Sequence, residues 1–68
     1  MSIGENIREL RTERGLTQSA LAAHIGVSQK AIDYWERGVN EPKASYISAL
    51  AAYFGVSADF LLGLKEEP

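Results

Sequence analysis

The sequence predicts an all-α domain built from five short helices. Five of its six glycines are each followed by an aliphatic residue. Helices commonly end this way, because glycine adopts the left-handed conformation without strain and the apolar residue folds back onto the last turn. Serine or threonine precedes most of the intervening segments, as expected at helix starts. No segment alternates strictly between apolar and polar residues, so no strand is expected. The five glycines are Gly15, Gly26, Gly38, Gly55 and Gly63.

The first helix is predicted from about Ile3 to Arg14. Ser2, with Glu5 three residues later, forms a capping box, in which each side chain accepts a hydrogen bond from the other residue's backbone amide. Arg11 flanks the apolar face of this helix. The face itself consists of residues at three- and four-residue spacing, namely Ile3, Ile7 and Leu10.

The second helix is predicted from about Gln18 to Ile25, after Thr17, and the third from about Gln29 to Arg37, after Ser28. Only residues 26–28 join them, too few for an antiparallel arrangement, so the two helices should cross steeply as a helix-turn-helix between residues 18 and 37. Their expected core residues are Leu21, Ala22 and Ile25 in the second helix and Ala31, Ile32 and Trp35 in the third.

The fourth helix is predicted from about Ser45 to Phe54, and the fifth from about Ala58 to Leu62, after Ser57. The start of the fourth is less defined, because Pro42 favours a helix that begins at or just after it, and either Lys43 or Ser45 could hold the first turn. The charged residues 65–68 are expected to be frayed. Expected core residues are Ile47, Leu50, Ala51 and Phe54, then Leu61 with Phe60 or Leu62.

Length and composition indicate one small domain that spans all 68 residues. The chain has no cysteine, which excludes disulfides, thiolate metal sites and cysteine nucleophiles. It has neither a secretion signal nor a long apolar run, so a soluble cytoplasmic protein is expected. The formal net charge is −2, which argues against non-specific attraction to a polyanion.

The central segment resembles the Cro and lambda-repressor family of helix-turn-helix proteins, the XRE type. The likeness runs from Ile3 to Gly63 and includes the closing segment 55–62. It implies a compact five-helix lambda-repressor-like DNA-binding domain, with the third helix in the major groove and the second across the backbone. The residues that carry it are Thr17-Gln18-Ser19-Ala20-Leu21-Ala22, Gly26-Val27-Ser28, Ile32, Trp35-Glu36-Arg37-Gly38 and Pro42.

The outer arc of the third helix is polar throughout, and four of its residues are candidate base contacts. Gln29 can offer an acceptor and a donor to adenine, and Lys30 can reach guanine or a phosphate. Tyr34 can pack on a thymine methyl group or bond the backbone. Asp33 either accepts from cytosine or pairs with Lys30 or Arg37. Composition alone favours a solvated helix face, and only the enclosing motif reverses this in favour of the DNA-contact interpretation.

Backbone anchoring is expected from hydroxyl, amide and basic groups around the motif, namely Thr17, Gln18, Ser28, Arg37, Asn40 and Lys43. The resemblance implies a structural ion pair between Glu36 and Arg11. Tyr46 and Tyr53 are expected to pack against neighbouring helices, and His24 is expected to be exposed or to contact a phosphate, without a catalytic role.

The sequence thus predicts a sequence-specific regulator of transcription, a repressor that binds double-stranded DNA as a homodimer on a palindromic operator. The dimer could form only on DNA. By analogy with phage repressors, its interface would contain Ala58, Phe60, Leu61 and Leu64. The alternative is a protein–protein interaction module of the same fold, such as an anti-repressor or a toxin-neutralising partner. No enzymatic activity, cofactor, metal, small-molecule ligand or membrane partner is expected.

Overall fold

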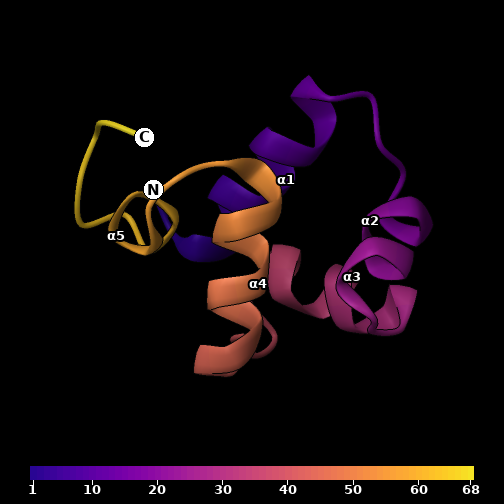
Figure 1. Cartoon of the computed structure of the whole chain (residues 1–68). Helices are drawn as coiled ribbons and strands as arrows, with labels where there is room; N and C mark the ends of the chain where they lie inside the picture. Colours follow the sequence, from indigo (N-terminus) through magenta and orange to yellow (C-terminus); the bar gives the residue numbers. More distant parts are fainter.

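A computed structural model describes all 68 residues and contains five helices without a strand, which confirms the predicted fold class. Figure 1 shows α2 and α3 together at one end of the molecule and α5 at the other, beside both termini. None of the helices is long and apolar enough to cross a membrane. Their bounds are α1 Ile3–Glu13, α2 Gln18–Ile25, α3 Gln29–Arg37, α4 Ala44–Phe54 and α5 Ala58–Leu61.

Hydroxyl caps begin four of the five helices, as the sequence predicts. The Ser2 hydroxyl accepts from the Glu5 amide at 3.2 Å, and Glu5 Oε1 accepts from the Ser2 amide at 3.0 Å. The hydrogen bond from the Ser2 amide, and in second place one from the Ser2 side chain, favour the ionised carboxylate and lower the pKa of Glu5. Thr17, Ser28 and Ser57 cap α2, α3 and α5 in the same way.

The boundaries differ from the prediction by one residue in three places. α1 ends at Glu13, with Arg14 as its C-cap, and α5 ends at Leu61. α4 begins at Ala44, and its N-cap Lys43 makes no side-chain capping bond. The ambiguous start of α4 therefore reflects the lack of a capping side chain there.

The core draws on all five helices. Ile7, Leu21, Ile32, Leu50 and Leu61 are the largest side chains that are completely buried, and each belongs to a different helix. Tyr46 packs against Trp35 with ring centroids 5.6 Å apart, and Tyr53 stacks on the exposed His24 at 4.8 Å. The remaining buried hydrophobic residues are Ile3, Ala22, Trp35, Ala51 and Phe54.

Two features near the N-terminus fix how α1 lies on the other helices, and sequence reasoning assigned a role to neither. Asn6 is a buried polar residue that donates from Nδ2 to the carbonyls of Phe60 and Leu61 at 3.2 and 3.1 Å. Gly4 lies so close to the C-terminal end of α3 that a Cβ atom there would stand 2.1 Å from the Trp35 carbonyl oxygen. α1 is thus tied to α5 and pressed against α3.

The C-terminal residues, which the sequence predicts to be frayed, make two contacts with the start of α5. The Pro68 carbonyl accepts from the Ser57 amide at 2.9 Å, and Lys65 Nζ lies 3.9 Å from Asp59 Oδ2. The tail therefore turns back toward the start of α5 (Figure 1).

Replacement of Gly4 by alanine should destabilise the domain by at least about 2 kcal/mol, because backbone atoms of α3 occupy the space that the methyl group needs. Urea unfolding followed by circular dichroism measures the change. Gly15→Ala is the matched control, since a Cβ there meets nothing within 4 Å and only the positive φ opposes it. An equal loss in both variants would contradict the close packing of α1 on α3.

Candidate nucleic-acid interface

A short turn orients α3 against α2. Gly26 ends α2 in the left-handed conformation, with φ of 84°, and Ser28 already caps α3. Leu21 from α2 and Ile32 from α3 are completely buried in the joint. α3 packs on α2 and on α1, whereas α5 contacts α1 and α4. One side of α3 is therefore held by two helices, and its other side faces outward.

The outward side of α3 carries the residues that the sequence proposes as DNA contacts. Gln29, Lys30 and Arg37 are exposed, and Asp33 and Tyr34 are half-buried. On the opposite side, Ile32 is completely buried and Trp35 is 6% exposed. The helix thus separates a core face from a polar face, as its spacing predicts.

Arg11 of α1 and Glu36 of α3 form a bidentate ion pair. Arg11 Nε donates to Glu36 Oε2 at 2.6 Å and Nη2 donates to Oε1 at 3.0 Å. A third donor, Nη1, reaches the Leu16 carbonyl at 2.7 Å. The two side chains are only 13% and 3% exposed, and the bonds to Glu36 raise the pKa of Arg11. The structure therefore brings together the two residues that the resemblance pairs, and their bond joins α1 to the last turn of α3.

A second polar network links α2 to the outer face of α3. Gln18 donates from Nε2 to Glu36 Oε1 at 3.1 Å and to Asp33 Oδ1 at 3.3 Å. Its own oxygen, Oε1, accepts from Gln29 Nε2 at 3.0 Å. Gln18 thus contacts two other residues predicted to meet DNA, Asp33 and Gln29. Sequence reasoning missed this network, because it depends on side-chain conformations across two helices.

Asp33 also pairs with Arg37, one of the partners that the sequence offers it. Arg37 Nε donates to Asp33 Oδ2 at 3.0 Å, and Nη2 lies 2.9 Å from the same oxygen. Asp33 does not pair with Lys30. Hydrogen bonds from Gln18 and then from Arg37 lower the pKa of Asp33, so its carboxylate is ionised at neutral pH.

Tyr34 lies between the two basic residues of the outer face. Lys30 Nζ is 5.3 Å from the centroid of the Tyr34 ring, and the Arg37 guanidinium carbon is 5.4 Å from it. Both cations are within the range of cation–π attraction. The ring thus spaces two positive charges along the surface of α3.

The backbone-contact candidates lie around the same face. The hydroxyls of Thr17 and Ser28 accept from the amides of Ala20 and Ala31, so both residues stand at helix N-termini. A groove between α3 and the following loop is lined by three candidate backbone contacts, Ser28, Asn40 and Lys43. Two candidate base contacts, Lys30 and Tyr34, and the acidic Glu41 line the same groove.

Comparison with known proteins assigns this arrangement to a family. The model of the helix-turn-helix family named HTH_3 matches residues 7–61. The chain belongs to the XRE-type helix-turn-helix family. This confirms the resemblance that the sequence shows. The chain is 36% identical over 66 residues to the HTH-type transcriptional activator BcrR of Enterococcus faecalis, and the match covers 97% of this chain and 32% of that protein. The chain is 40% identical over 60 residues to repressor protein C2 of Salmonella phage P22, and the match covers 88% of this chain and 28% of that protein.

Solved structures of family members superpose on nearly the whole chain. The P22 c2 repressor in complex with synthetic operator 9T has a TM-score of 0.89 and 37% identity, with 96% of this chain and 98% of that chain covered. SinR, described as the master regulator for biofilm formation, in complex with DNA has a TM-score of 0.80 and 31% identity, with 88% and 97% covered. The chain itself spans about a third of the length of BcrR and of P22 C2.

Of the four residues proposed for a dimer interface, one is wrong. Leu61 is completely buried in the core, so it cannot reach a partner chain without unfolding of α5. Ala58 is exposed, Phe60 is half-buried and Leu64 is 72% exposed. The sequence prediction of Leu61 as a core residue is confirmed, and its place in the interface, which came from the analogy with phage repressors, is not compatible with that burial.

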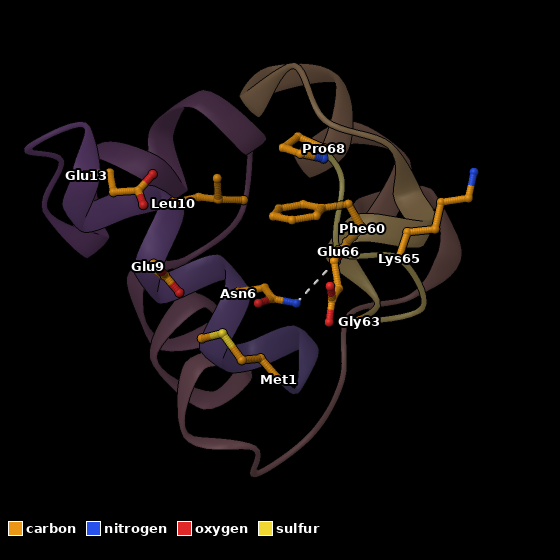
Figure 2. A pocket seen from close by; sticks show the side chains of 10 residues that line it. All are labelled: Met1, Asn6, Glu9, Leu10, Glu13, Phe60, Gly63, Lys65, Glu66 and Pro68. Atoms are coloured by element: carbon orange, nitrogen blue, oxygen red, sulfur yellow. Dashed lines mark hydrogen bonds between the residues drawn. The ribbon is translucent and has the colours of Figure 1, made fainter.

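A pocket with acidic residues on its wall lies beside Phe60 (Figure 2), and no residue of α3 lines it. Figure 2 shows the Phe60 ring and the Leu10 side chain pointing toward one another. Met1, which is 68% exposed, lies at the same pocket, and three carboxylates line it, namely Glu9, Glu13 and Glu66.

Loss of one member of the buried ion pair should be costly, because it leaves the other charge without a partner. Glu36→Ala is expected to lower the free energy of unfolding by about 3–5 kcal/mol. Urea unfolding measures it, with Glu41→Ala, an exposed carboxylate in the following loop, as control. The double variant Arg11→Met with Glu36→Leu should recover much of the loss. A Glu36→Ala protein as stable as the control would refute the structural role of the pair.

Proposed function

We propose that this chain is a sequence-specific DNA-binding regulator of transcription, and that α3 enters the major groove while α2 crosses the backbone above it. The observation that carries the proposal is the outer face of α3. Its polar side chains are exposed or half-buried, and bonds to α1 and α2 hold the helix in place. Membership of a family that includes repressors solved with DNA supports it.

The proposed contacts divide into two groups. Base edges are met by Gln29, Lys30, Asp33 and Tyr34, and phosphates by Thr17, Gln18, Ser28, Arg37, Asn40 and Lys43. Asp33 would act mainly by excluding wrong sites, because a carboxylate that faces phosphates is tolerated only where its partners remain satisfied.

A net charge of −2 does not oppose this proposal, because the acidic groups are unevenly placed. On the α3 side, Arg37 and Arg11 neutralise Asp33 and Glu36. Three other carboxylates, those of Glu9, Glu13 and Glu66, line the pocket beside α5. The face proposed to meet DNA is therefore less negative than the chain as a whole.

We further propose that the regulator is a cytoplasmic repressor that acts as a homodimer on a palindromic operator. One short helix carries few base contacts, and a second copy about 34 Å away on the same face of the DNA multiplies the specificity ratio. The dimer contact would use Ala58, Phe60 and Leu64. No catalytic role is proposed.

The second candidate is a protein–protein interaction module. The pocket beside Phe60 favours it, since the exposed Met1 lines this pocket together with three carboxylates. A partner for this end of the molecule would present apolar and basic side chains. In that case the chain would select no operator from a pool of random duplexes.

Two substitutions separate base contacts from backbone contacts. Gln29→Ala should relax the base preference at one position of each half-site by about 1–3 kcal/mol, and Lys43→Ala should weaken binding to all sequences alike. Selection from a random duplex pool supplies the operator. Fluorescence anisotropy then measures affinity for it and for its single-base variants. If both variants bind as the parent does, α3 is not the recognition helix.

The dependence of affinity on salt tests the number of phosphate contacts. If Lys30, Arg37 and Lys43 each neutralise one phosphate, a dimer displaces about six counterions, and log K should fall with log salt at a slope of about −5. Anisotropy titrations between low and moderate salt measure the slope. A slope near zero would exclude the proposed backbone contacts.

Removal of the Asp33 charge should raise affinity and lower discrimination. Asp33→Asn removes the carboxylate that competes with a phosphate for Arg37, while its amide oxygen can still accept from Gln18, so binding to non-operator duplex should tighten about three- to tenfold. Glu41→Gln removes one negative charge without that pairing and serves as control. Equal effects in the two variants would show that only net charge matters.

A further inference from the structure

We propose that the pocket beside Phe60 binds a small organic cation, in which a protonated amine is carried on an apolar body. The pocket has a volume of about 500 Å³ and lies between α1 and the C-terminal segment that begins at Phe60 (Figure 2). Pockets of this size commonly hold small molecules. No residue of α3 lines it, so the inference does not depend on the proposed DNA-binding function.

One continuous face of α1 forms a wall of the pocket. Its residues follow one another at three- and four-residue spacing, which places them on the same side of a helix. Two of them, Glu9 and Glu13, are exposed carboxylates one turn apart. Like charges at this spacing destabilise a helix slightly, and a cation held between them would remove that repulsion. The four residues of this wall are Asn6, Glu9, Leu10 and Glu13.

The carboxylates of the pocket have no cation of their own. The ion pairs of the chain engage Glu36, Asp33 and Asp59, and none of them involves a carboxylate of the pocket. Lys65 lines the pocket, but its Nζ lies 3.9 Å from Asp59 Oδ2. The ammonium group of Met1 forms no ion pair with them either. A positive ligand would therefore meet carboxylates that are free to bind it.

A buried polar side chain also opens into the pocket. Asn6 is only 7% exposed and lines the pocket, and its Nδ2 donates to the carbonyls of Phe60 and Leu61. No hydrogen bond within the chain reaches its Oδ1. Since no buried side-chain oxygen lacks a partner, Oδ1 must be accessible, and the pocket is where Asn6 is open. The polar groups of the α1 wall are thus all acceptors, which require a ligand with N–H donors.

The other half of the site is apolar. The Leu10 side chain and the Phe60 ring point toward one another (Figure 2), and both are half-buried. Met1, which is 68% exposed, lines the same pocket. An apolar body between these side chains would remove their remaining surface from water, and the Phe60 ring also attracts a cation. An anion would be repelled, and a neutral apolar molecule would leave the acceptors unmet.

The test is an NMR titration of the 15N-labelled chain with three matched probes at constant salt. These are 4-phenylbutylamine, its neutral analogue 4-phenylbutanol, and n-butylamine, which lacks the ring. The phenylbutylamine should bind about fivefold or more tightly than either of the others. Its amide shifts should gather at residues 6–13 and 60–66, with α3 unchanged. Equal affinities for the amine and the alcohol, or shifts spread over all acidic residues, would overturn the inference.

A pair of double variants separates the site from net charge. Glu9→Gln with Glu13→Gln should lower the affinity for phenylbutylamine about fivefold, to that of the alcohol, and leave binding of the alcohol unchanged. Glu41→Gln with Glu67→Gln removes the same charge from residues that do not line the pocket, and should keep the preference for the amine. All four positions are exposed, so both proteins should fold. Equal losses in the two variants would overturn the site.

The same chemistry could come from side chains of a protein partner, and a blocked Lys-Phe dipeptide represents that source. It should bind no more tightly than phenylbutylamine. Binding about tenfold tighter would overturn the small-molecule assignment in favour of a protein partner. These titrations contain no DNA, so their failure leaves the proposed function intact. Failure of the chain to select an operator would likewise leave this inference intact.

Discussion

Arg11 and Glu36 form an ion pair where α1, α2 and α3 come together. This pair fixes the position of α3 and therefore of its outer face. The pair is almost fully removed from solvent, which makes the loss of either partner more costly than the loss of a surface ion pair. It joins α1 to the last turn of α3, and Gln18 of α2 adds a hydrogen bond to the same Glu36 oxygen. These bonds hold the residues on the outer face of α3 at a fixed position relative to the core.

Two ion pairs, Arg11–Glu36 and Arg37–Asp33, explain how an acidic chain would present the proposed surface to a polyanion. The carboxylates on the α3 side are bonded within the domain, so their charges are partly neutralised before any ligand arrives. Lys30 and Arg37 remain on the outside, spaced by the Tyr34 ring. Affinity for DNA would then depend on a few cations at defined positions, and base specificity on the orientation of hydrogen-bonding groups. Net charge describes neither property.

Local signals made most of the fold predictable. Ser2, Thr17, Ser28 and Ser57 mark helix starts through bonds within four residues, and so they can be identified in the sequence. Gly4 packs against α3, and Asn6 donates to a carbonyl of α5. Both partners are distant in the sequence, and no neighbouring residue indicates these contacts. Leu61 was correctly predicted in the core, but the analogy with phage repressors also placed it in the dimer interface, and a completely buried side chain cannot serve there. Residue types indicated the polar face of α3, but the Gln18 network needed three-dimensional structure.

The central claim is that the outer face of α3, fixed by Arg11 and Glu36, is the surface that meets DNA. An NMR titration of the 15N-labelled chain with its selected operator tests it most directly. The account predicts the largest amide shifts at residues 28–37, with smaller ones near Thr17 and Lys43, and any shifts at α5 appearing together with dimer formation. Shifts centred on the acidic pocket beside Phe60, with α3 unchanged, would contradict it.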